Sequence, residues 1–280
     1  MLLFMRRLLR KPAFWLGGSI VAALFLIAVV GPYLAPYDPF KMDTLLRLRP
    51  PSVEHLFGTD EFGRDIFSRM LHGTRISLMI GAISVGIALM IGGALGLLSG
   101  YIGGWVDHSI MAVMDLLLAF PTILLALAIV AVLGPSLNNA MMAVGLAAVP
   151  AFTRLVRGSV LVVRTQVYIE AARAVGGTPI WIMWKHVLPN VIAPVLVLIT
   201  LQFPAALLSS AALGFIGLGA QPPSPEWGAM MVSARTFLRR APWMVNYPGF
   251  AIMLTVLGFN LLGNALRDVF DPTQRNKELR

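Results

Sequence analysis

The stretch ISLMIGAISVGIALMIGGALGLL, Ile76–Leu98, holds 23 residues and no charged side chain. A helix rises about 1.5 Å per residue, so about 20 apolar residues are enough to cross the hydrocarbon core of a bilayer. Across the 280 residues, 58% are hydrophobic, only 12% are charged, and the mean hydropathy is +0.79. A water-soluble domain of this length needs more polar surface. We therefore predict an all-α membrane protein.

Outward from this stretch, the same criterion gives six spans. They are Ala13–Gly31, Ile76–Leu98, Ser109–Leu133, Ala140–Gly158, Val191–Gly214 and Gly249–Leu266. The first is longer than the apolar core of a cleavable signal peptide, about 7–15 residues, which predicts an uncleaved signal anchor. The fourth is interrupted by Arg154 and Arg157, but arginines near a helix end can reach the headgroups. We expect its helix to continue past the bilayer through Val160–Val163.

The distribution of lysine and arginine predicts the orientation. With the N-terminus inside, the cytoplasmic segments carry 13 of these residues and the outer segments 9, six of them in the long loop Lys41–Arg75. Long loops cross the membrane with less regard to charge, so both termini are predicted to be cytoplasmic. The net charge of +9 then arises from basic span ends. We expect membrane lipid as a partner and no nucleic acid.

Small residues and prolines mark the predicted spans. Glycines recur every fourth residue at Gly92, Gly96, Gly100 and Gly104, a spacing typical of closely packed membrane helices. Prolines that remove a backbone hydrogen bond and kink a helix lie inside spans three, four and five, at Pro121, Pro150 and Pro204. Asp115, near the cytoplasmic end of span three, is interpreted as an interfacial carboxylate rather than a proton relay.

Two outer segments predict amphipathic helices on the membrane surface. In LFGTDEFGRDIFSRMLHGTR, which begins at Leu56, Thr59 or Asp60 is the expected N-cap and Gly73 the expected end. Before span six, Ser224, Pro225 and Glu226 are expected as N-cap, first residue and first-turn acid. One face follows and ends at Pro242; it consists of Trp227, Met230, Met231, Ala234 and Leu238. Simple packing and an outer gate are both open interpretations.

Several kinds of chemistry have no sequence support. The chain has no cysteine, which excludes disulfides and thiolate chemistry. GxxxxGK[ST], HExxH and GxSxG are all absent, so no nucleotide, metal or catalytic site is predicted. A secondary transporter normally carries ionisable residues near the middle of its spans, and these spans hold almost none. The sequence predicts a pathway without its own energy source.

The segment EAARAVGGTPIWIMWKHVLPN, Glu170–Asn190, interrupts the apolar pattern. Its composition predicts a short helix over Thr165–Val175, ended by Gly176 and Gly177. A second helix is expected to start with Thr178 as N-cap and to end before Pro189, since proline biases the preceding residue away from the helix. The segment therefore predicts a helix-turn-helix loop on the cytoplasmic side.

This segment resembles the EAA loop of ABC-importer permease subunits, at Glu170, Ala171, Ala172, Gly176, Leu188 and Pro189. His186 stands where that family has isoleucine. Five further segments are similar to the C-type permease of dipeptide, oligopeptide and nickel importers, and the similarity runs from about Leu26 to Asp271. These segments are FGTDEFGRDIFSRMLHGTRISL, GPSLNNA, PAFTRLVRG, LGFIGLGAQPPSPEWGAM and FNLLGNALRDVFDP.

The resemblance implies a type I importer permease that pairs with a homologous second permease. It also implies two ATPase subunits, which bind ATP and Mg, and an extracytoplasmic binding protein. The chain itself would have no cofactor and no enzymatic activity. Coupling to an ATPase would fall to Glu170, Ala171, Ala172, Arg173, Gly176, Leu188 and Pro189, with a small-residue face of Ala171, Ala172 and Ala174. An outer family motif comprises Gly58, Thr59, Asp60, Gly63, Arg64 and Asp65.

The implied function is import of di- or oligopeptides across the cytoplasmic membrane by alternating access. Nickel or glutathione are the alternative substrates, and a self-sufficient channel or secondary transporter is the alternative class. The expected organisation is a signal anchor and outer loop over 1–75, a permease core over 76–270 with the coupling loop at 164–190, and a cytoplasmic tail over 271–280.

Overall fold

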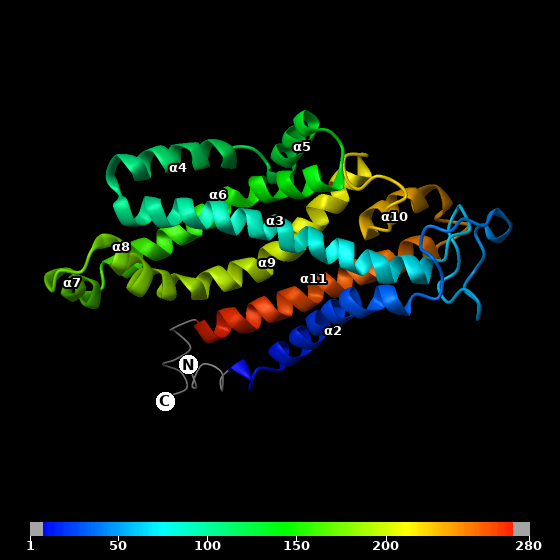
Figure 1. Ribbon diagram of the computed structural model, residues 1–280, viewed down its shortest axis with the longest axis horizontal. Coiled ribbons are helices and arrows are strands. Elements are labelled where there is room, and N and C mark those ends of the chain that lie inside the picture. The colour runs from blue at the N-terminus through cyan, green and yellow to red at the C-terminus, as the bar shows by residue number, and fades with distance from the viewer. Residues whose placement is uncertain (1–7, 271–280) are drawn as a thin grey trace.

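The computed structural model describes residues 8–270, which fold into helices and loops without a named strand in that range. Arg6, Arg7 and the expected tail 271–280 lie outside the described residues. The long helices run side by side (Figure 1) and match the predicted spans, with longer ends. They are α2 Pro12–Leu34, α3 Ile66–Ile102, α6 Leu137–Arg164, α9 Leu188–Phe215 and α11 Trp243–Phe270.

These five helices are long and apolar enough to cross a membrane, and a bent pair raises the number to six. That pair, α4 (Gly104–Leu118) and α5 (Thr122–Leu133), replaces the continuous helix predicted over Ser109–Leu133. The two axes differ by 92°. Pro121 lies just before α5, where its missing N–H cannot continue the helix. The predicted kink is therefore a break, whereas Pro150 and Pro204 stay inside α6 and α9.

The glycine stripe lies where α3 meets α6, the most extensive contact between two helices in the described chain. A Cβ on Gly92 would lie 2.6 Å from the carbonyl oxygen of Val149, and one on Gly96 would lie 2.6 Å from that of Thr153. Gly100 approaches Val160 in the same way. Three of the four predicted positions therefore permit close packing. Gly104 does not, because it begins α4 with open space around it.

The two arginines of span four are paired with α4. The guanidinium of Arg157 donates to both carboxylate oxygens of Asp107, at 2.5 and 2.7 Å, and Arg154 donates to Asp115 at 2.6 Å. Opposite charges therefore meet where α4 runs beside α6, and the helix continues to Arg164 as expected. These partners went unrecognised in the sequence, although the eight-residue spacing of the two aspartates places them on one face of a helix.

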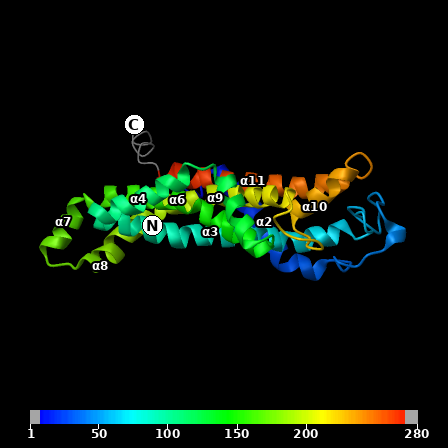
Figure 2. The same cartoon turned by 90° about the horizontal axis from the view of Figure 1, so that it is seen from above.

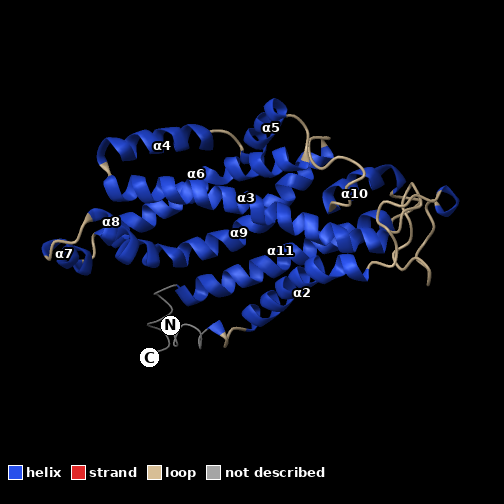
Figure 3. Ribbon diagram, in the orientation of Figure 1, coloured by secondary structure: helices blue, strands red, loops and turns tan. Residues whose placement is uncertain are grey.

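The bundle has two distinct ends. One end, called here the loop end, carries α7 and α8, and the described chain begins and finishes toward it (Figures 1 and 2). The other, called the motif end, carries residues 35–65 and α10, and Figure 3 shows most of the irregular backbone gathered there. Helices α2 and α11 pack against each other, and Phe203 of α9 stacks on Phe259 of α11 at 4.0 Å.

Candidate functional site

At the loop end, α7 spans Val167–Ala174 and stops at Gly176. The N–H of Gly176 donates to the carbonyl of Arg173, and that of Gly177 donates to the carbonyl of Ala172, both at 3.0 Å. These two bonds form a Schellman motif, in which the residue after the helix takes a left-handed conformation. Gly176 has φ +86°, so the predicted helix and its glycine stop are confirmed.

The second helix of the loop does not end at Pro189. Thr178 caps α8 (Pro179–Ile182) as expected, with its hydroxyl accepting from the N–H of Trp181. The chain then passes through the π-helical turn η2 (Met183–Val187) directly into α9. Leu188 is helical, and its N–H reaches back to Met183. Pro189 lies in the first turn of α9, where a missing N–H is tolerated. The predicted break before Pro189 was wrong.

One face of the loop packs against the bundle. Ile169, Ala172, Ile182 and Val187 are buried together with valines of α6 and with Val191. His186, the residue that departs from the family pattern, contacts the Trp181 ring edge-on at 4.9 Å. Ala172 is therefore part of the core. The prediction that Ala171, Ala172 and Ala174 form one exposed small-residue face is wrong for Ala172.

The opposite face of α7 is uncovered. It comprises Val167, Glu170, Ala171 and Ala174, which recur at helical spacing and are all exposed; we call it the α7 face. The side chains of Glu170 and Arg173 make no hydrogen bond or ion pair with another described residue. Val175 and Ile180, which flank the turn, are 84% and 69% exposed. Leu188 is half-buried and Pro189 exposed, so the seven predicted coupling residues divide between core and surface.

The loop is also anchored to α3. A guanidinium nitrogen of Arg164 donates to the carbonyl oxygen of Gly100 at 2.9 Å. That carbonyl belongs to the last turn of α3, so no N–H group further along the helix can donate to it. The side chain at the start of the loop therefore ties it to the helix that runs the length of the bundle.

At the motif end, the six predicted motif residues form one tight turn. Asp60 accepts hydrogen bonds from the backbone N–H groups of Phe62 and Arg64, at 2.8 and 2.9 Å, and from the Arg64 side chain at 2.5 Å. Gly63 has φ +75°, and a Cβ there would overlap the carbonyl of Asp43. Thr59 is bonded to both Arg49 and Leu46. The motif therefore positions the 35–65 segment.

The cap of α3 is Asp65, not Thr59 or Asp60. Its carboxylate accepts from the N–H of Ser68 at 2.7 Å and contacts Nδ1 of His55 at 2.9 Å. The helix then runs through Gly73, so the predicted end there was wrong. A Cβ on Gly73 would lie 2.2 Å from the carbonyl oxygen of Pro225. This glycine is needed for close approach of another segment rather than for a turn.

Arg69 joins three segments at this end. It donates to the carbonyl of Pro39 at 2.9 Å and to those of Pro223 and Ser224 at 3.3 Å, and it lies 3.6 Å from Asp60. Nearby, one carboxylate oxygen of Glu61 is buried without a hydrogen-bond partner among the described residues. Burial raises the pKa of Glu61. These charges hold the loops together and were not singled out by the sequence.

Helix α10 (Trp227–Ala234) is capped by Glu226 and not by Ser224. The buried Glu226 carboxylate accepts from the N–H groups of Gly228 and Ala229, at 2.9 and 2.7 Å. Burial raises the pKa of this carboxyl group. Trp227, Met230 and Ala234 of the predicted face are buried in the core, which favours simple packing, but the helix gives way to the 3₁₀ turn η3 (Arg235–Phe237), and Leu238 is exposed.

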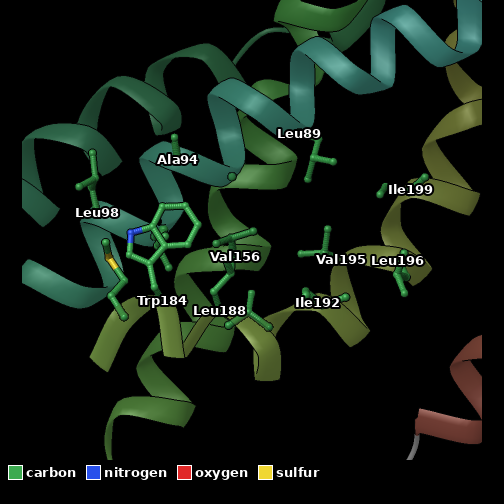
Figure 4. A pocket seen from close by; sticks show the side chains of 14 residues that line it. Leu89, Ala94, Leu98, Val156, Trp184, Leu188, Ile192, Val195, Leu196 and Ile199 are labelled. Atoms are coloured by element: carbon green, nitrogen blue, oxygen red, sulfur yellow. The ribbon is translucent and has the colours of Figure 1, made fainter. Parts of the chain in front are cut away.

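A large apolar hollow lies between α3 and the start of α9. Its volume is about 530 Å³, and leucine, isoleucine and valine side chains face it together with Trp184 (Figure 4). Within residues 8–270, no group of three or more His, Asp or Glu side chains is arranged to hold a metal ion.

Comparison with known proteins decides the family. Residues 92–276 match the model of the binding-protein-dependent transport system inner membrane component, and residues 1–51 match the N-terminal transmembrane domain of oligopeptide transport permease C. The chain belongs to this permease family. Its all-helical bundle and its apolar spans agree with a multi-pass protein of the inner membrane.

Curated relatives align with nearly the whole length of the permease. The dipeptide transport system permease protein DppC of Alkalihalophilus pseudofirmus is 50% identical over 93% of this chain and 86% of its own. The glutathione transport system permease protein GsiD of Pectobacterium atrosepticum is 47% identical over 96% and 90%. The probable D,D-dipeptide transport system permease protein DdpC of Escherichia coli is 45% identical over 92% and 87%.

A solved structure supports the fold independently. The inward-facing MetNI methionine ABC transporter aligns with a TM-score of 0.60 at 21% identity, covering 72% of the permease and 97% of that chain. The type I importer fold inferred from the resemblance is therefore confirmed, with a bent third span.

Proposed function

We propose that this permease forms half of the pathway of an ATP-driven importer for short peptides. The relatives named for dipeptide transport support this substrate class. Glutathione, itself a peptide, is a second candidate, because a relative of similar identity is named for its transport. The other half of the pathway is a homologous permease, and a binding protein delivers the substrate from outside.

The observation that carries the coupling role is the uncovered α7 face. Valine and isoleucine side chains exposed at the tip of a loop, beside two unpaired charges, are typical of a surface that another protein covers. We assign this surface to an ATPase subunit, with Glu170 and Arg173 at the contact and the Gly176 turn setting its direction. ATP and Mg then bind to two such partner subunits, and this chain contributes no hydrolysis.

The arrangement of the ends supports the proposed topology. The described chain begins and finishes toward the end that carries α7, which is consistent with both termini and the 164–190 loop lying in the cytoplasm. Residues 1–75 then provide an anchor helix and outer loop, 76–270 the core, and 271–280 a cytoplasmic tail. The motif residues Gly58, Thr59, Asp60, Gly63, Arg64 and Asp65 stabilise the outer surface on which the binding protein docks.

Reconstitution tests the proposal. The complete importer in proteoliposomes, with its binding protein outside and ATP inside, should accumulate a labelled dipeptide. Competition by glutathione and by nickel ranks the candidate substrates. The chain purified alone should not hydrolyse ATP but should co-purify with the ATPases when they are co-expressed. Substrate entry through this chain alone, without an ATPase, would favour a channel or secondary transporter instead.

A further inference from the structure

A second cavity lies halfway along the spans, where the third span breaks. It has a volume of about 170 Å³ and is lined by the middles of α3, α6 and α9 and by the α4–α5 junction. One water needs about 10–15 Å³ of such space, so the cavity holds several. Its wall includes Ser84, Thr122, Gln202 and Ser209. We call it the midspan cavity.

Three of these polar side chains have no partner in the described chain. The side chains of Gln202, Thr122 and Ser209 make no hydrogen bond with another described residue. By comparison, Thr153 and Thr255 donate to carbonyls of their own helices, at 3.0 and 2.8 Å. A polar group at the depth of the hydrocarbon core requires a partner or water. The unpartnered groups therefore face water, substrate or another subunit.

The cavity is kept open by small side chains. On α9, Gln202, Ala205, Ala206 and Ser209 recur at helical spacing, so the polar groups and the alanines between them share one face. On α6, Ala147, Ala148 and Ala151 form the facing wall. Apart from Val144 and Gln202, the residues of α6 and α9 that line the cavity are alanines and one serine.

The lining contains no ionisable residue. A primary amide and hydroxyl groups offer both donors and acceptors without charge, which matches the N–H and C=O groups of a peptide backbone. A bare divalent cation would find no carboxylate or imidazole here. We propose that the midspan cavity is this permease's contact site for the peptide amides of the moving substrate, with Gln202 as its main hydrogen-bonding group. This inference rests on the proposed importer function.

Cysteine labelling tests whether the cavity lies on the pathway. Because the chain has no cysteine, Gln202→Cys, Ser209→Cys and Leu208→Cys each provide a single thiol in this subunit. In the assembled importer, a small hydrophilic thiol reagent should label positions 202 and 209, and saturating dipeptide with binding protein should slow this labelling. Leu208, which is 49% exposed and outside the cavity, should label slowly and show no protection by substrate.

Uptake measurements test the role of Gln202. Gln202→Leu should raise the KM for dipeptide uptake about 2- to 10-fold, as expected for one lost hydrogen bond. Gln202→Asn, which keeps a shorter amide, should raise the KM less. Stimulation of ATP hydrolysis by the binding protein should persist in both variants. Ala148→Leu should lower uptake by filling the cavity. Wild-type levels of these variants in the membrane establish that assembly is intact.

The outcomes separate the two proposals. If the wild-type importer takes up no peptide, the proposed function fails. If it does take up peptide but positions 202 and 209 stay unlabelled, or crosslink to the second permease in every state, only the midspan site fails. Unchanged uptake kinetics in Gln202→Leu would likewise overturn the role of Gln202.

Discussion

Gly176 gives the sharpest test at the scale of one residue. Its left-handed backbone, φ +86°, lies in open space, so a side chain meets no obstacle and only the backbone conformation is penalised, by roughly 1–2 kcal/mol for a β-branched residue. Gly176→Val should therefore redirect the end of α7 while the spans stay inserted. We expect near-normal membrane levels, weaker association with the ATPases or uncoupled hydrolysis, and a large loss of uptake.

Gly158→Ala is the matched control, because Gly158 also has open space around it but lies within helix α6. It should transport normally. Gly177→Ala is not a suitable control, because its Cβ would lie 2.7 Å from the carbonyl oxygen of Ala172. Full uptake by Gly176→Val at wild-type abundance would show that this turn does not position the coupling loop.

The two arginine–aspartate pairs of α4 and α6 predict unequal costs. Arg157 and Asp107 have 29% and 15% of their side chains exposed, against 56% and 59% for Arg154 and Asp115. Asp107→Asn should lower the free energy of unfolding by roughly 1.5–3 kcal/mol, since a charged hydrogen-bonding group loses its partner. Asp115→Asn should lower it by less than about 1 kcal/mol. Thermal unfolding of the detergent-purified protein measures both, and equal losses would contradict the ranking.

At the scale of the element, α7 has a buried face and an exposed face, and the exposed face is the proposed contact with an ATPase. Ala171 is exposed, whereas Ala172 is 8% exposed in the cluster around Ile169. Ala171→Trp should leave the thermal stability of the permease unchanged but reduce co-purification with the ATPase subunits. Ala172→Trp should destabilise the loop itself, because overpacking a filled core forces its neighbours apart. Normal ATPase association in Ala171→Trp would remove the α7 face from the contact.

Helix α10 predicts a pH dependence through its cap. Burial raises the pKa of Glu226 above its ordinary value of 4.5, so the folded protein favours the protonated form. The contribution of this group to the free energy of unfolding is fully present at low pH. It is lost as the pH rises through the raised pKa of the folded protein. Glu226→Gln keeps an oxygen acceptor for the helix N–H groups without titrating. Its unfolding temperature should fall less than that of the wild type between pH 4 and pH 8; identical slopes would contradict this.

Elements set by local chemistry were predictable from the sequence. The spans follow from uncharged length, α7 and its stop from a glycine pair, and α8 from Thr178 and Pro179. The cap of α3 was misplaced by five or six residues and that of α10 by two, because several acidic or hydroxyl residues stand before each helix. Which of these residues caps the helix depends on how the 35–65 segment and the 221–226 loop pack, and this packing places Asp65 before α3 and Glu226 before α10.

Features that depend on distant segments were not predictable. The break at Pro121 and the continuation through Pro189 involve the same residue type with opposite outcomes. At Pro121 the helix turns by 92°, while at Pro189 a π-helical turn absorbs the missing N–H. The midspan cavity likewise combines residues from four segments of the chain. Sequence spacing places Gln202 and Ser209 on one face, but not opposite Ala148.

At the scale of the whole molecule, the proposed orientation can be tested directly. Tags near Asp43 or Arg235, at the motif end, should react in intact cells, whereas tags within 164–185 or after Arg280 should be protected. The last of these lies outside the described residues. Reaction at Arg173 from outside the cell would overturn both the orientation and the coupling role.

Helix α3 connects the two ends mechanically. It is unbroken for 37 residues, about 55 Å at 1.5 Å per residue. Arg69 fastens its first turns to Pro39 and Ser224, and Arg164 fastens the 164–190 loop to its last turn. A rod held at both ends transmits displacement along its length without a hinge to absorb it. A load applied at the motif end, where we propose that the binding protein docks, therefore acts on the loop some 50 Å away.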